Sequence, residues 1–186
     1  MPRHIAFLRA INVGGRVVKM DHLRRLFESV PLANVETFIA SGNVIFDSGR
    51  AGGASLEKKI ERHLERALGY PVATFVRSAA EVRSVAAYRP FAPADCEAPM
   101  HAVYIGIMRA EPSPDARKKV LALGDDLNDL HLHGRELYWL CRRKMMESIV
   151  TMGKLEKTLG VPATFRNANT LRRLAARYAG AMIDPL

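Results

Sequence analysis

HIAFLR, residues His4–Arg9, is the stretch that decides the fold. It reads as a strand with apolar side chains on both faces, Ala6 and Leu8 on one face. Ile5 and Phe7 point to the other face. A single layer of helices covers one face of an antiparallel sheet and leaves the other open. Apolar residues on both faces therefore predict that the open face is covered, either by the other half of the chain or by a second subunit.

The pattern downstream of this strand predicts a βαββαβ unit. In order, the expected elements are a helix from Met20 to Phe27, strands Val35–Ile39 and Val44–Phe46, a helix from Leu56 to Leu68, and a strand Val72–Val76. Gly42 followed by Asn43 between two strands is typical of a two-residue type II′ hairpin turn. This order of elements is that of a ferredoxin-like plait.

The second half of the chain repeats the order. His101–Gly106 echoes the first strand at an offset of about 97 positions, a repeat carried by pattern more than by identity. The elements expected after it are a helix signalled by Ser113-Pro114-Asp115, a hairpin around His133–Arg135, a helix from Glu147 to Leu159, a short strand Ala163–Arg166 and an extra helix Thr170–Ala179. The sequence thus predicts an α+β fold of two tandem ferredoxin-like (βαββαβ) α/β plaits with an extra C-terminal helix.

Proline marks the expected domain boundary. Pro90, Pro93 and Pro99 fall within one short stretch that follows a helix near Ala80–Tyr88. We therefore expect residues 1–88 to form the first plait with its connecting helix and residues 89–99 to be a Pro-rich linker. Residues 100–186 should form the second plait with the C-terminal helix. The halves should pack together, with any ligand site near their junction.

The chain is basic, with 28 Lys and Arg residues against 19 Asp and Glu residues and a net charge of +9. The excess is concentrated between Met1 and Arg25 and between Arg135 and Arg177. Such a field attracts anions, including nucleotides and nucleic acid. A solvated basic surface that only aids solubility accounts for the charge equally well.

Several function classes find no support in the sequence. No apolar run approaches the ~20 residues that cross a bilayer, and the N-terminus has no signal-peptide pattern, so we expect a cytoplasmic protein without membrane segments. Cys96 and Cys141 lie far apart and fit reduced thiols. His131 and His133 share a strand face but lack a third ligand, so no metal site is predicted. Arg142–Lys144 is interpreted as a solvated loop.

Three polar motifs are the candidate binding residues. The loop Asn12–Gly15 and the stretch Arg166–Thr170 each lie between a strand and a helix, and Ser41–Asn43 lies between two strands. Glycine amides, guanidinium groups and side-chain amides are groups that bind anions. Each motif is also explained by a turn or a helix cap alone. The predicted ligand-binding residues, which would converge as matching edges of two plaits, are Asn12, Gly14, Gly15, Ser41, Asn43, Arg166, Asn167, Asn169 and Thr170.

The same stretches resemble the bacterial domain-of-unknown-function family 1697. The resemblance is carried by Leu8–Gly15, by Met20-x-x-Leu23-Arg24 and by Thr37–Phe46. A closing signature runs from Leu155 through Leu159-Gly160 to Ala163–Asn167 and Thr170. The sequence departs from the family pattern at Phe165, where a small polar residue is more usual, and over Arg142–Met152. The resemblance implies tandem α/β plaits and brings no activity, cofactor or catalytic residue.

Three functions stay open at this stage. The first is a module that binds an anionic ligand, a nucleotide or nucleic acid, at the junction of the two halves. The second is an enzyme acting on an anionic small molecule, with His4, His101 or Asp21 as the candidate general base. The third is a structural or interaction protein without a ligand. The sequence names no cofactor, does not decide whether the protein is an enzyme, and fits a monomer or a homodimer.

Overall fold

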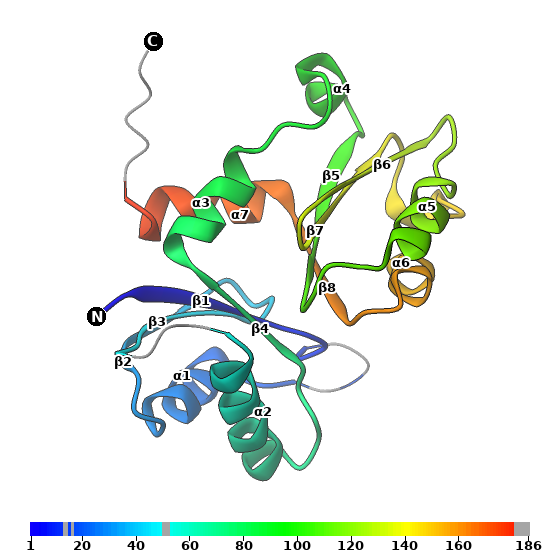
Figure 1. Cartoon of the computed structure of the whole chain (residues 1–186). Helices are drawn as coiled ribbons and strands as arrows, with labels where there is room; N and C mark the ends of the chain where they lie inside the picture. Colours follow the sequence, from blue (N-terminus) through cyan, green and yellow to red (C-terminus); the bar gives the residue numbers. More distant parts are fainter. Residues whose placement is uncertain (13–14, 16, 50–52, 181–186) are drawn as a thin grey trace. The chain divides into compact units, whose positions relative to one another are not determined.

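The computed structural model describes residues 1–12, 15, 17–49 and 53–180 (Figure 1). The chain divides into two compact units. Unit 1 comprises Met1–Ser84 and the segment that begins at Arg172, and unit 2 comprises Val85–Leu171. Within the described residues the fold is mixed α+β, with seven α-helices and two four-stranded antiparallel sheets, which confirms the predicted class.

Unit 1 contains the first sheet, whose strand order is β2-β3-β1-β4 with every neighbouring pair antiparallel. Its elements are β1 (Arg3–Leu8), α1 (Met20–Glu28), β2 (Ala33–Phe38), β3 (Asn43–Asp47), α2 (Ala54–Leu68), β4 (Thr74–Ser78) and the beginning of α3 (Ala79–Ala87). Each strand and helix expected between His4 and Val76 is present, with ends that differ by a few residues.

One face of this sheet is packed against α1 and α2, which lie side by side beneath it in Figure 1. Ala6 and Leu8 of β1 point to this face and join a buried cluster with Leu23 of α1 and Leu64 of α2. The stripe of apolar residues at helical spacing predicted for α2 therefore faces the sheet.

The opposite face of the sheet is also covered, as the apolar pattern of His4–Arg9 predicts. Ile5 and Phe7 are fully buried there. At β2 the cover comes from α7 (Ala168–Tyr178). The ring of Tyr178 meets Phe38 edge-on at 6.1 Å, and the Tyr178 hydroxyl donates to Glu36 Oε2 at 2.9 Å. The covering part of α7, from Arg172 on, is distant in sequence but belongs to the same unit as this sheet.

Unit 2 has a second sheet with the equivalent order β6-β7-β5-β8. Its elements are α4 (Pro93–Glu97), β5 (Ala102–Met108), α5 (Pro114–Leu121), β6 (Asn128–His133), β7 (Glu136–Cys141), a 3₁₀ turn (Met145–Glu147), α6 (Met152–Leu159), β8 (Ala163–Asn167) and the beginning of α7. Trp139 is fully buried on the face that carries α5 and α6, and its indole N–H donates to Asn128 Oδ1 at 2.9 Å.

The second face of this sheet meets the segment at the end of α3. The Tyr138 hydroxyl donates to the Val85 carbonyl at 3.1 Å. The ring of Tyr88 stacks on His133 at 4.2 Å, and its hydroxyl lies 2.8 Å from His131 Nε2. The two histidines share a strand face as predicted, and their neighbour there is an aromatic ring.

Corresponding backbone hydrogen bonds occur in the two sheets. The Leu8 amide donates to the Gly42 carbonyl, and the Met108 amide donates to the Arg135 carbonyl. These equivalent strand ends lie 100 positions apart, so the predicted offset of about 97 is wrong. Strand pairing aligns His4 with Tyr104 rather than with His101. His4 is paired with Ser78 and Tyr104 with Asn167, and these partners are the last residues before α3 and α7 begin.

Two local predictions need correction. The β2–β3 connection is a loop of four residues, Ile39–Gly42, rather than a two-residue type II′ turn, and both Ile39 and Gly42 have positive φ. Asn43 already belongs to β3, because its buried side-chain amide donates to the Phe38 carbonyl and ties the loop to the preceding strand. The predicted linker, residues 89–99, contains the short helix α4, which starts with proline at its first position.

Candidate functional site

The predicted motif residues of unit 1 do come together. Asn12 Nδ2 donates to the Ala40 carbonyl at 3.0 Å, and Asn12 Oδ1 accepts from the Val18 amide at 2.7 Å. The loop after β1 and the β2–β3 loop therefore lie against each other. Both polar ends of the Asn12 amide are engaged in holding these loops, which is a structural use of the side chain.

Close packing at Gly42 explains the second motif. A Cβ at Gly42 would lie 2.6 Å from Ile11 Cγ2, and its φ of +72° is one that side-chain-bearing residues rarely adopt. Asn43 Nδ2 also donates to Ser41 Oγ at 2.8 Å, so the exposed Ser41 hydroxyl is tied to the loop. Gly15 is exposed with a φ of +82°. Gly14 lies outside the described residues.

The motif of unit 2 is built around a buried arginine. Arg166 is only 8% exposed, and its Nη1 donates to Thr164 Oγ1 at 2.9 Å and to the Phe165 carbonyl at 2.8 Å. Burial lowers the pKa of Arg166 to about 10. Asn167 Oδ1 accepts from the Asn169 amide at 2.9 Å and so caps α7. Asn169 is exposed and Thr170 is half-buried.

Arg166 has a counterpart in unit 1. Strand pairing places Arg77 opposite Ile5 and Arg166 opposite Ile105, which are equivalent positions of the two sheets. Arg77 is 2% exposed and donates to the Val76 carbonyl at 3.1 Å, as Arg166 does to the residue before it. A buried arginine therefore occupies the same register in both sheets.

The two motifs lie at different ends of their own sheets. Asn12 and Ser41 follow the end of β1 and β2, where β1 finishes at Leu8. Asn167 ends β8 beside Tyr104, near the beginning of β5. The first motif follows β1, the first strand of its sheet, whereas the second motif follows β8, which runs antiparallel to β5, the first strand of its sheet.

A basic pocket in unit 1, absent from the sequence-based candidates, has a volume of about 320 Å³. It lies between the end of α1 and the outer face of α2 and is lined by Ser29, Val30, Pro31, Lys59, Arg62, His63 and Arg66. Lys59, Arg62 and Arg66 occupy one helical face because they are spaced by three and four residues. No acidic residue is among the described residues that line the pocket.

The positively charged side chains of this pocket are not paired with acidic side chains among the described residues. Within the part of the chain that the structure describes, neither Arg62 nor Arg66 forms an ion pair. Arg62 Nε makes one long contact, 3.4 Å, with the Lys58 carbonyl of its own helix. The sequence signal for this site is three cations at helical spacing between the apolar positions of α2. The sequence analysis drew on the apolar positions of this segment alone, to predict a helix.

The hydrogen-bond roles of Ser29 and His63 follow from their partners. Ser29 Oγ lies 2.8 Å from the Leu26 carbonyl and 2.9 Å from His63 Nε2. The carbonyl can only accept, so the single hydroxyl proton of Ser29 goes to Leu26. Ser29 Oγ therefore accepts from His63, which holds the imidazole with its Nε2 protonated.

A second pocket, of about 300 Å³, adjoins the basic one and shares Pro31 and Lys59 with it. The other described residues that line it are uncharged: Leu32, Ser48, Gly49, Ser55 and Leu56. The pair of pockets therefore has a strongly basic end and a neutral end.

The histidines and acid proposed as general bases have other surroundings. His4 is buried and stacks on Phe46 with ring centroids 5.8 Å apart. His101 Nδ1 lies 2.7 Å from the Asp95 carbonyl, and Asp21 is exposed in the first turn of α1. None of the three lines either pocket.

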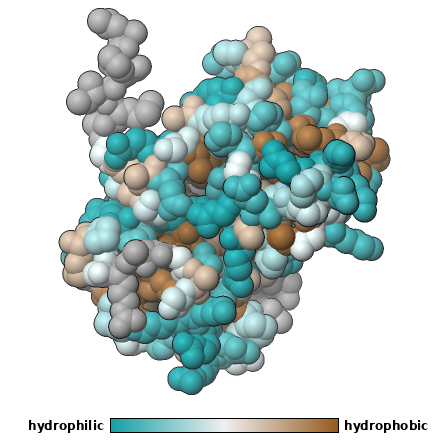
Figure 2. All heavy atoms as spheres, in the orientation of Figure 1, coloured by the Kyte–Doolittle hydropathy of each residue, from teal (hydrophilic) through white to brown (hydrophobic). Residues whose placement is uncertain are grey.

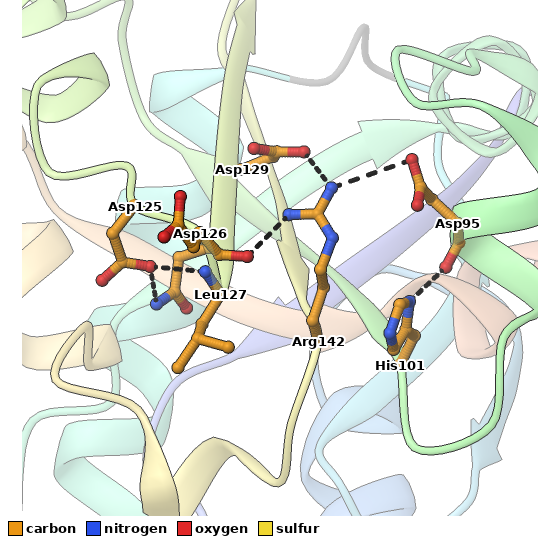
Figure 3. Close-up of polar contacts among 8 residues, drawn as sticks. Asp95, His101, Asp125, Asp126, Leu127, Asp129 and Arg142 are labelled. Carbon is orange, nitrogen blue, oxygen red and sulfur yellow. Dashed lines mark hydrogen bonds and ion pairs between the residues drawn. The ribbon is translucent and has the colours of Figure 1, made fainter.

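Figure 3 shows the polar contacts of Arg142 and Asp125 in unit 2. Arg142 Nη2 lies 2.6 Å from Asp129 Oδ2 and 3.7 Å from Asp95 Oδ2, and the Asp129 hydrogen bond raises the pKa of Arg142. Asp125 Oδ1 accepts from the Leu127 amide and from Asn128, which lowers the pKa of Asp125. Arg142 was interpreted as part of a solvated loop; it is instead the centre of an ion-pair cluster.

A third pocket, of about 410 Å³, is lined by Val17, Val18, Lys19, His22, Ala67, Leu68 and Tyr70. Among the described residues no three His, Cys, Asp or Glu side chains are grouped as metal ligands, and no helix is both long and apolar enough to cross a membrane. On the face drawn in Figure 2, hydrophilic and hydrophobic residues are interspersed.

Comparisons with known proteins identify a family and a related fold. The model of the family described as "Protein of unknown function (DUF1697)" matches residues 1–138. The conserved bacterial protein SP0830 from Streptococcus pneumoniae has a similar structure, with a TM-score of 0.67, 19% sequence identity, and coverage of 94% of this chain and 97% of that one. At that identity the likeness shows the fold alone. No curated protein matches the sequence. The closing signature that starts at Leu155 lies outside the matched residues.

Proposed function

The chain belongs to the DUF1697 family of proteins of unknown function, and we propose that it binds a small anionic ligand in the basic pocket of unit 1. The observation that carries this proposal is the convergence of Lys59, Arg62, His63 and Arg66 on one pocket whose described lining contains no acid. Cations concentrated without counter-charges raise the local concentration of anions and supply several charge-assisted donors.

The size of the pocket favours a small molecule. Ligand pockets typically measure about 300–1,000 Å³, and the basic pocket lies at the lower end of that range. A nucleotide phosphate fits such a volume. A nucleic acid would use the same side chains for backbone phosphates, and its affinity would fall steeply with salt.

The geometry supports binding rather than nucleophilic catalysis. A serine nucleophile needs a histidine that accepts its proton. Here His63 donates to Ser29, and the serine proton is directed to the Leu26 carbonyl. An enzyme acting on an anionic small molecule is accordingly the second candidate, with His63 as the titratable group already inside the pocket.

Ligand-induced thermal stabilisation at low salt tests the proposal. Inorganic phosphate, nucleotides and a short oligonucleotide are screened against the native protein and against Arg62→Gln/Arg66→Gln. The matched control is Lys58→Gln, which removes a positive charge from an exposed position of the same helix outside the pocket. We expect stabilisation of the native protein and the control, and a loss of roughly ten-fold or more in affinity for the double variant. Equal stabilisation of all three proteins would overturn the assignment.

The convergence of the sequence motifs at the junction of the two halves is a separate proposal. In it, Arg166 neutralises the ligand while Asn12, Asn43 and Asn169 orient it. Burial of Arg166 beside neutral acceptors supports it, since a dry guanidinium binds anions strongly. Arg166→Lys keeps the charge and removes the bidentate geometry. A ligand shift unchanged in Arg166→Lys and in Asn169→Ala would rule this site out.

We also propose a tandem duplication of ferredoxin-like plaits. Support comes from the same antiparallel strand order in both sheets and from equivalent backbone hydrogen bonds at Leu8 and Met108. In this proposal residues 1–88 and 100–186 are the two copies, joined by the linker 89–99. Free Cys96 and Cys141 are consistent with a reducing, cytoplasmic location, and the protein is proposed to act as a monomer or a homodimer.

A further inference from the structure

We infer that the ligand is the phosphate monoester of a small hydroxylated molecule, with its phosphate in the basic pocket and its uncharged body in the adjoining pocket. This inference rests on the proposed function of the basic pocket. The observation behind it is the contiguity of two pockets of unlike chemistry, which share Pro31 and Lys59.

The basic pocket matches phosphate better than carboxylate. Two guanidinium groups, Arg62 and Arg66, present planar forks of donors, and Lys59 adds an ammonium group at the boundary between the pockets. A carboxylate has two oxygens and one charge. A monoester phosphate has three terminal oxygens and up to two charges, so it can engage more of these donors at once.

The adjoining pocket suits a neutral body. Leu32 and Leu56 provide apolar surface, and Ser48 and Ser55 provide hydroxyl groups. Lys59 is its only charged lining residue among those described, and that residue faces the basic pocket as well. A sugar or nucleoside presents both apolar ring faces and hydroxyl groups, which is the combination that such a lining recognises.

The two volumes suit one small molecule. They are about 320 and 300 Å³, so a phosphate and a body the size of a sugar or a nucleoside both have room. A further pocket, of about 410 Å³, is lined in part by Ala67 and Leu68, which follow Arg66 in α2. A polymer would have to continue across the exposed surface of α2, where Glu65 lies next to Arg66. The acid disfavours a track of consecutive phosphates along this helix.

Calorimetric titration at low salt with four probes tests the inference: inorganic phosphate, ribose 5-phosphate, adenosine 5′-monophosphate and a single-stranded oligonucleotide. We expect at least one monoester to bind roughly ten-fold or more tightly than inorganic phosphate, because the body adds contacts in the second pocket. The variant Ser55→Trp fills that pocket from an exposed position. It should lose the advantage of the monoester and keep the affinity for inorganic phosphate. Arg62→Gln/Arg66→Gln should weaken both.

The outcomes separate this inference from the function on which it rests. If none of the four probes binds, the anion-binding proposal itself fails. If inorganic phosphate binds and both monoesters bind no better, or if Ser55→Trp weakens phosphate and ester equally, the anion pocket stands and the monoester assignment falls. Tighter binding of the oligonucleotide than of either monoester, with a steep salt dependence, replaces the monoester with nucleic acid.

Discussion

Removal of the Tyr178 side chain tests whether α7 stabilises the second face of the first sheet. Tyr178 is 7% exposed, its ring meets Phe38 edge-on at 6.1 Å, and its hydroxyl donates to Glu36 at 2.9 Å. Burial and the bond to Glu36 both raise the pKa of Tyr178, so the hydroxyl stays protonated as a donor near neutral pH. The side chain therefore contributes through apolar burial, an aromatic pair and one hydrogen bond.

These contributions give an expected magnitude. Truncation of a buried aromatic residue to alanine costs about 3–5 kcal/mol, so Tyr178→Ala should lower the free energy of unfolding by about 3 kcal/mol. Tyr178→Phe removes only the hydroxyl. A hydrogen bond to a charged group contributes about 1.5–3 kcal/mol when it is buried. The Glu36 side chain is 45% exposed and can be solvated by water, so the loss should be about 1 kcal/mol.

Urea denaturation at neutral pH measures both variants, and a shift of the midpoint at constant slope reports stability. Ala176→Ser, at an exposed position of the same helix, is the control and should change the free energy by about 0.5 kcal/mol or less. The double variant Phe38→Ala/Tyr178→Ala should show a coupling of about 0.5–1.5 kcal/mol. A cost below about 1 kcal/mol for Tyr178→Ala, or a coupling of zero, would refute the covering role of α7.

Three further outcomes follow from individual contacts. The hydrogen bond from Arg3, opposed by burial, holds the pKa of Asp47 below its ordinary value, so the unfolded state takes up the proton first as pH falls. Stability from this group is complete above about pH 4 and lost as pH drops through the folded-state pKa, and Asp47→Asn should flatten that part of a pH–stability curve measured by urea denaturation. Gly42→Ala should destabilise by about 1–3 kcal/mol in the same assay, because its Cβ would lie 2.6 Å from Ile11 Cγ2 at a φ of +72°; no loss would show that the loop can move aside. Gly106→Ala should cost a similar ~1–3 kcal/mol, because its Cβ would lie 2.8 Å from Phe165 Cε1, and Phe165→Leu should restore part of the loss measured by thermal unfolding.

The contact between Gly106 and Phe165 depends on the pairing of two strands. Phe165 lies across the sheet from Gly106 in the β5–β8 pairing. The large ring occupies the space that a Cβ at residue 106 would need. The sequence contained both residues, but their proximity depends on strand register, which a single chain does not reveal.

Local periodicity predicted most of the fold because strands and helices are recognised by short-range patterns. The apolar alternation of His4–Arg9 gave β1 and the correct expectation that both of its faces are covered. The β2–β3 loop was missed because Asn43 satisfies the Phe38 carbonyl from within β3, a bond between side chain and backbone that turn propensities do not anticipate. The offset of the repeat differs by a few positions because the apolar pattern of a strand does not fix where the strand pairs, whereas strand pairing places His4 and Tyr104 at corresponding positions.

The candidate site was harder to predict because its residues form a pocket only through tertiary packing. Lys59, Arg62 and Arg66 form an ordinary exposed helical face until the end of α1 places Ser29 and Pro31 beside it. Conversely, Asn12 and Asn43 are conspicuous in sequence and engaged in structural hydrogen bonds. Sequence therefore draws attention to polar residues in loops, whereas a pocket made by cations on a helix becomes visible only in the structure.

The path of the chain explains why covering helices escape prediction from sequence. Tyr178 contacts Glu36 across 142 positions, and both belong to unit 1, although the strand that leads into α7 belongs to unit 2. The same relation holds in reverse for α3, which begins in unit 1 and whose following Tyr88 stacks on His133 of unit 2. In each unit, the second face of the sheet is therefore covered by a segment of the same unit that lies far from the sheet in sequence or directly follows the other unit. Burial of apolar side chains under these segments is the physical reason that strands of both sheets are apolar on both sides.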